Sequence, residues 1–143
     1  MNTQKKLQNT LEDSKASLKL KLAMLWASLM FLYIYVDYFH LYMPGKIEDL
    51  LKRRVFEFDI TQGFLFATLA SVTIPALMIF FSVALPAKVN RWANISIAAV
   101  YIPFTLFNLA GEFWLHMVAG AVAEVALLCL IIRYAWKWPR FKT

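Results

Sequence analysis

The feature that most constrains this chain is a series of four apolar runs, each about 20 residues long, joined by short polar connections. A helix that crosses a bilayer needs about 20 mainly apolar residues, whereas a helix on a soluble domain carries only an apolar stripe. Hydrophobic residues make up 61% of the 143 residues, against roughly 45 to 50% in soluble domains. The sequence therefore predicts an all-α fold, a four-transmembrane-helix bundle.

The four spans are expected at about residues 21–43, 62–85, 92–110 and 113–134. Pro44 and Gly45 end the first span, because proline removes a backbone donor and glycine permits a turn. Pro75 lies near the middle of the second span, where a kink would free a carbonyl for another partner. The connections leave no room for a soluble domain, so residues 1–143 are predicted to form a single integral membrane domain.

Two further segments have amphipathic patterns. The basic N-terminal segment is suited to lying on a membrane surface, and its leucines at helical spacing are Leu7, Leu11, Leu18, Leu22 and Leu25. Between spans one and two, the stretch KIEDLLKRRVFEFDITQ is too short and too charged to cross. Its apolar positions predict a short interfacial helix and are Ile47, Leu50, Leu51, Val55 and Phe58.

The distribution of lysine and arginine predicts the orientation. With four spans, the N-terminal segment, the second loop and the C-terminal tail share one side, and they hold eleven of these residues. The first loop, on the opposite side, holds four. Because basic residues are enriched on the cytoplasmic side, both termini are predicted to be cytoplasmic.

The charge and cysteine content exclude some functions. The net charge is +6, but the basic residues flank apolar runs. This placement favours the lipid bilayer, with its anionic headgroups, as the partner and argues against nucleic acid. The single cysteine, Cys129, lies inside the fourth run, so neither an intrachain disulfide nor a thiol pair for redox chemistry can form.

Four short stretches carry a resemblance to a known family. They are YVDYFHLYMPG at the end of span one, ITQ at the start of span two, NRWANI from Asn90 to Ile95, and YAWKW from Tyr134 to Trp138. With these stretches, the chain resembles an uncharacterised bacterial family of small four-span membrane proteins. That family is described only as a domain of unknown function and is loosely DoxX-like in architecture. The resemblance implies this fold and a place in the bacterial cytoplasmic (inner) membrane, but no reaction.

The acidic residues inside the spans indicate where a site lies. Asp37 is roughly 22 Å into a hydrocarbon core about 30 Å thick, nearer the extracytoplasmic face. Helical spacing places Tyr33 and His40 on the same side as Asp37. The simplest interpretation is that Asp37 and His40 are interfacial residues that water and each other satisfy.

Polar residues of spans three and four reach the same leaflet. Asn108 and Glu112 end span three, and His116 begins a stripe on span four that continues to Glu124 near the midplane. A carboxyl at this depth must be protonated, paired or in contact with water, because an unpaired charge there costs several kcal/mol. The candidate ligand-binding residues are Tyr33, Asp37, His40, Asn108, Glu112, His116 and Glu124.

Three functional hypotheses follow. The first is binding or transport of a small molecule or ion through an extracytoplasm-facing polar pocket, more easily formed in so small a bundle by a homodimer. The alternative is a membrane assembly or scaffold protein without a ligand, whose acids only lock the helices together. The third is a metal-dependent intramembrane enzyme acting on a lipid or quinone. The spacings DYFH and EFWLH match no metal signature and no catalytic motif is present, which weighs against an enzyme and leaves any metal or cofactor unknown.

Overall fold

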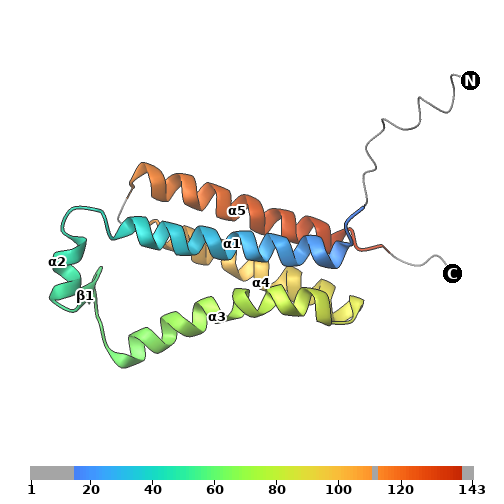
Figure 1. Cartoon of the computed structure of the whole chain (residues 1–143), viewed down its shortest axis with the longest axis horizontal. Coiled ribbons are helices and arrows are strands. Elements are labelled where there is room, and N and C mark those ends of the chain that lie inside the picture. The colour runs from blue at the N-terminus through green and yellow to red at the C-terminus, as the bar shows by residue number, and fades with distance from the viewer. Residues whose placement is uncertain (1–14, 111–112, 140–143) are drawn as a thin grey trace, which may run out of the picture.

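The computed structural model describes residues 15–110 and 113–139. Four long helices dominate it: α1 (Leu18–His40), α3 (Gln62–Ala84), α4 (Ala87–Phe107) and α5 (Leu115–Trp136). Three short elements join α1 to α3: α2 (Lys46–Leu51), β1 (Arg54–Val55) and β2 (Phe58–Asp59). Figure 1 shows the long helices side by side, with the short elements gathered beyond one end of them.

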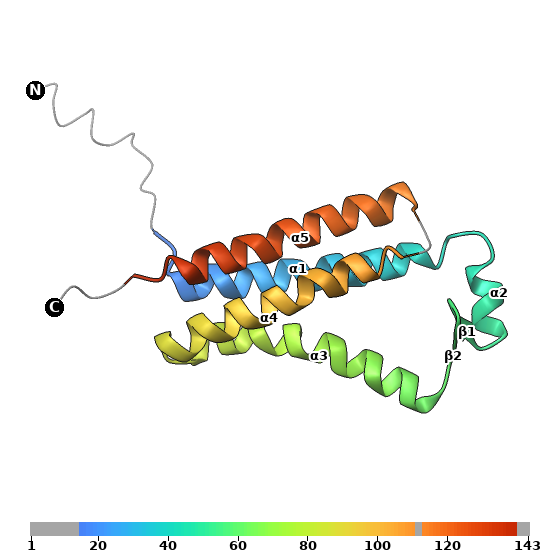
Figure 2. The same cartoon turned by 180° about the vertical axis from the view of Figure 1, so that it is seen from behind.

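The long helices run alternately up and down. The start of α1 and the end of α5 lie together, and we call this the terminal end of the bundle (Figures 1 and 2). The short elements lie at the opposite end, here called the hairpin end. α1 packs against both α3 and α5, and α4 packs mainly against α5, so consecutive helices α4 and α5 form a hairpin.

The ends of the helices follow from local sequence. The side chains of Ser17 and Thr61 accept hydrogen bonds from the first turns of α1 and α3, as good N-cap residues do. Pro86 precedes α4, which begins at Ala87, earlier than the predicted start at about residue 92. The predicted start lies too far along the chain because the first turns of α4 carry Lys88, Asn90 and Arg91. These residues lower the local hydropathy without breaking the helix.

The connection at the hairpin end differs from the prediction of one amphipathic helix extending to Phe58. α2 ends at Leu51, and an antiparallel pair of strands follows, with Arg54 opposite Asp59 and Val55 opposite Phe58. Arg53 and Phe56 have φ angles of 59° and 53°. Residues with left-handed backbone angles end a right-handed helix. The prediction of one helix through this stretch is therefore wrong, and only its first six residues are helical.

Among residues 15–110 and 113–139, three helices are long and apolar enough to cross a membrane, namely α1, α3 and α5. They indicate a membrane protein. The helix α4 is of similar length, with 21 residues, but its polar side chains lower its hydropathy. The predicted N-terminal amphipathic segment lies mostly in residues 1–14, outside the described residues.

The most densely packed part of the bundle lies toward the terminal end. Its fully buried side chains include Leu22, Trp26 and Leu29 of α1, with Leu128 and Ile131 of α5. Only the second half of α3 joins this core, through the buried residues Pro75, Met78 and Ser82. The first half of α3 diverges from the other helices toward the hairpin end (Figures 1 and 2).

Candidate functional site

The candidate site is a buried polar cluster around Glu124, near the middle of α5. The Glu124 side chain is 5% exposed, and Thr105 of α4 and Tyr33 of α1 are 1% and 8% exposed. The hydroxyls of Tyr33 and Thr105 are 3.3 Å apart and share a hydrogen bond. The Glu124 carboxyl lies close enough to the Thr105 side chain to interact with it. Three helices therefore place one acidic and two neutral polar groups together inside the bundle.

A close approach between α1 and α5 brings these groups together. Gly120 lies one turn before Glu124, and a Cβ built there would lie 2.5 Å from Cγ2 of Val36. Because only glycine has no side chain, it lets the two backbones come this close. Ala121, the next residue, is also buried. The small residues thus hold α1 against the part of α5 that carries the acid.

The electrostatic surroundings of Glu124 are unusual for a buried acid. The groups close enough to interact with it among the described residues are Thr105, Tyr33 and Asp37, which are neutral or acidic. Asp37 lies one turn beyond Tyr33 on α1 and is exposed. No described lysine, arginine or histidine forms an ion pair with Glu124. A carboxyl in this position requires a proton or a bound cation to balance its charge when it is shielded from water.

The remaining predicted site residues occupy different positions toward the hairpin end. His40 is half-buried, lies close enough to interact with Asp37, and has its ring 5.4 Å from that of Phe56. Asn108 is exposed at the C-cap of α4. His116 is half-buried, and its Nε2 atom has no hydrogen-bond partner among the described residues. Glu112 lies outside the described residues.

The structure thus brings Tyr33, Asp37 and Glu124 together, with His40 beside Asp37. No interaction joins His116 or Asn108 to Glu124 within the described part of the chain. In that same part, no group of three or more histidine, cysteine, aspartate or glutamate side chains is arranged to hold a metal ion. The chemistry available at Glu124 is therefore that of a carboxyl with neighbouring hydroxyls.

Sequence comparison places the chain in a family. The profile of a family of unknown function, DUF6326, matches residues 10–142. The chain belongs to the DUF6326 family. No curated protein and no solved structure matches the chain. The DUF6326 match agrees with the expectation of an uncharacterised domain family and supplies no reaction or ligand.

A second buried polar cluster in this DUF6326 chain was not predicted as part of a site. Oδ1 of Asn94 accepts hydrogen bonds from Nε1 of Trp26, at 2.7 Å, and from the hydroxyl of Ser82, at 3.3 Å. Nδ2 of Asn94 donates to the carbonyl and side-chain oxygens of Asn90, at 2.9 and 2.7 Å. All four side chains are fully buried. Every polar atom of the Asn94 amide is satisfied, so this cluster joins α1, α3 and α4 as a structural element.

The sequence did contain a signal for this second cluster. Asn90 and Asn94 are four residues apart in NRWANI, a stretch used above only for the resemblance. Two amides one helical turn apart in an otherwise apolar helix must face protein, because lipid offers them no partner. Trp26 of α1 is fully buried and donates the hydrogen bond that joins α1 to this cluster.

Proposed function

We propose that this chain is a four-span protein of the bacterial cytoplasmic membrane that binds a proton or a small monovalent cation at Glu124. The ligand reaches Glu124 from the extracytoplasmic side, past Asp37. In this proposal Glu124 supplies the negative charge, while the hydroxyls of Thr105 and Tyr33 supply neutral oxygen atoms. Protons and hard cations bind to carboxylate and hydroxyl oxygens.

One observation carries the proposal: the Glu124 carboxyl is 5% exposed and has no cationic partner among the described residues. An acid with a purely structural role inside a bundle is usually paired with a basic side chain. Where it is not, substitution by the corresponding amide costs little stability. Glu124 instead interacts electrostatically with a second carboxyl, that of Asp37. Two neighbouring carboxyls share protons or cations more readily than either does alone.

The exposure of Asp37 supports an entry route from the hairpin end. Asp37 lies four residues beyond Tyr33 toward that end, and its side chain is exposed while Tyr33 is buried. His40, three residues further along α1, interacts with Asp37, and histidines beside carboxyls are common members of proton relays. The order His40, Asp37, Glu124 therefore describes a path inward from the membrane surface.

The length and packing of α4 support four spans. Its 21 residues extend roughly 30 Å at about 1.5 Å per residue, which matches the hydrocarbon core. Three of its polar residues, Asn90, Asn94 and Thr105, are buried against neighbouring helices and are not exposed to lipid. With four spans the start of α1 and the end of α5 lie on one side, and the basic residues assign that side to the cytoplasm.

Transport would need a path from Glu124 to the terminal end. That half of the bundle is filled by buried apolar side chains and the Asn94 cluster. Binding by a single chain is therefore the proposed activity, and transport would require a second copy to complete the path, as a homodimer.

The proposal is tested by cation-dependent stability. Purified protein in a neutral detergent is heated in sodium, potassium or choline chloride at constant ionic strength, with Glu124→Gln and, as a matched control, Glu57→Gln. Glu57 is 93% exposed at the hairpin end. We expect sodium or potassium to raise Tm relative to choline in the parent and in Glu57→Gln, and to have no such effect in Glu124→Gln.

Protonation alone would give a different pattern that also supports the proposal. The Tm of the parent would then depend on pH in a way that Glu124→Gln loses, with sodium and choline equivalent. A Glu124→Gln protein with the same cation and pH dependence as the parent would contradict the proposal. That result would favour the scaffold function, in which the acid only holds helices together.

A further inference from the structure

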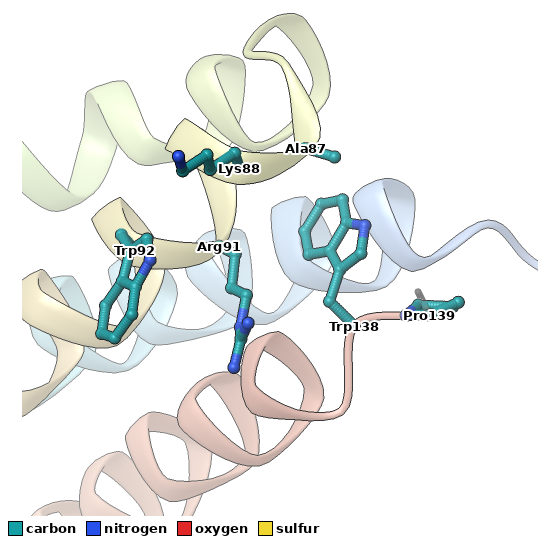
Figure 3. A pocket seen from close by; sticks show the side chains of 6 residues that line it. All are labelled: Ala87, Lys88, Arg91, Trp92, Trp138 and Pro139. Atoms are coloured by element: carbon teal, nitrogen blue, oxygen red, sulfur yellow. The ribbon is translucent and has the colours of Figure 1, made fainter. Parts of the chain in front are cut away.

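A cavity at the terminal end is independent of the Glu124 site. It has a volume of about 210 Å³ and lies between the start of α4 and the segment that follows α5. Figure 3 shows its lining: Ala87, Lys88, Arg91, Trp92, Trp138 and Pro139. Since a water molecule takes about 30 Å³ in the liquid, the cavity has room for a group of several heavy atoms.

The lining has positive charge and no negative charge. Lys88 and Arg91 are its two ionisable residues, and the others are apolar or aromatic. The neighbouring cavity, of about 270 Å³, is lined by Leu130, Arg133, Tyr134 and Lys137 and is likewise free of acids. An isolated pair of cations in a partly enclosed space attracts an anion.

Arg91 is held in place but retains unused donor capacity. Its guanidinium carbon lies 5.5 Å from the ring of Trp92 and 5.5 Å from the ring of Trp136. Its Nε atom is buried and has no hydrogen-bond partner within the described residues. A planar guanidinium is suited to the paired oxygens of phosphate or carboxylate.

The backbone around the cavity is rigidly supported. Asn90 donates to the carbonyls of Ser82 and Leu85, at 2.6 and 3.4 Å. The ammonium group of Lys19 donates to the carbonyls of Val83 and Leu85, at 3.0 and 2.7 Å. These bonds fix the short connection between α3 and α4, so Lys88 and Arg91 start from a preorganised position.

We propose that this cavity binds a phosphate group, with the Arg91 guanidinium as the donor and Lys88, whose side chain extends in a different direction (Figure 3), as a further positive charge of the lining. Tryptophans at a bilayer boundary place such a phosphate at the depth of lipid headgroups. The phosphate can belong to an anionic lipid or to a soluble phosphate, and the experiment below separates these two sources.

The test measures the binding of three probes to the full-length protein in a neutral detergent. Dioleoylphosphatidylglycerol, dioleoylphosphatidylcholine and inorganic phosphate are titrated while thermal unfolding is followed, and the midpoint of each titration gives an apparent affinity. The variants are Arg91→Met and Lys88→Gln. Arg133→Met serves as the matched control, since Arg133 is an exposed arginine at the same end but outside this cavity.

We expect phosphatidylglycerol to stabilise the protein and phosphatidylcholine not to, with Arg91→Met weakening the affinity on the order of tenfold. Stabilisation by inorganic phosphate with the same dependence on Arg91 would assign the site to a soluble phosphate. Equal losses in Arg91→Met and Arg133→Met would reveal only a general positive field and overturn the proposal. If Arg91→Met does not fold, the exposed Lys88→Gln variant decides, because an unchanged affinity there would also overturn it.

Discussion

The hydroxyl of Tyr101 in α4 donates a hydrogen bond to the backbone carbonyl of Ser71 in α3. Ser71 is the residue four positions before Pro75, and proline has no N–H to donate to that carbonyl. The structure confirms the prediction that Pro75 frees a carbonyl for another partner. This hydrogen bond joins α3 to α4.

We expect Tyr101→Phe to lower stability by about 1 kcal/mol, because it leaves the part-buried Ser71 carbonyl without a donor. The measurement is the free energy of unfolding in mixed micelles. In a Pro75→Ala background the cost should shrink, since the alanine N–H restores the helical hydrogen bond to Ser71. Tyr35→Phe, at a residue 55% exposed, is the control. An equal cost of Tyr101→Phe in both backgrounds would contradict this interpretation.

Gly120→Ala should destabilise the contact between α1 and α5 by about 1 to 3 kcal/mol, because the new methyl group would meet Val36 at 2.5 Å. Adding Val36→Ala should recover most of that loss by making space. Gly63→Ala is the matched control, since its methyl group would meet only the Thr61 side chain at 3.8 Å. Thermal unfolding of the three variants checks the prediction, which fails if Val36→Ala gives no rescue.

The Asn94 cluster predicts an order of stabilities. Asn94→Leu removes the partner of Trp26 and Ser82 and should cost about 2 kcal/mol, because it leaves several buried polar groups unsatisfied. Trp26→Phe should cost less in hydrogen bonding, because Ser82 and Asn90 still interact with Asn94. Chemical or thermal unfolding that ranks Trp26→Phe as neutral and Asn94→Leu as stabilising would exclude a structural role for the cluster.

The sequence predicted the features that depend on single segments. Runs of apolar residues located the long helices, Pro44 and Gly45 marked the end of the first, and Pro75 identified the carbonyl of Ser71 as available. It also drew attention to Glu124, because a lone acid in an apolar run is conspicuous without any knowledge of its neighbours. Local patterns suffice for such features since they depend on spacing and backbone chemistry alone.

Features that depend on packing between segments could not be predicted. Which side chains meet depends on how the helices rotate against one another, so the Asn94 cluster and the partner role of Thr105 remained hidden. The two-stranded hairpin after α2 was missed because its formation depends on left-handed residues, Arg53 and Phe56, whose types do not favour that conformation.

Site-directed labelling tests the four-span arrangement. Single cysteines at Asn2, Lys52 and Trp138, in a Cys129→Ala background, are reacted with a membrane-impermeant maleimide in intact cells. With four spans and cytoplasmic termini, position 52 reacts from outside and positions 2 and 138 only after lysis. If α4 did not cross, the two ends of the chain would lie on opposite sides, and one of positions 2 and 138 would then react in intact cells.

Infrared difference spectroscopy shows whether Glu124 exchanges its proton or cation with the outside, as we propose. The protein is studied in lipid films in two separate experiments: sodium replaces choline at constant pH, and the pH is changed at constant salt. We predict a carboxylic-acid C=O band that is exchanged for a carboxylate band, is lost in Glu124→Gln and is retained in Glu57→Gln. A Glu124 band that stays unchanged under every condition would contradict the account, because it would show a buried acid that never exchanges its proton.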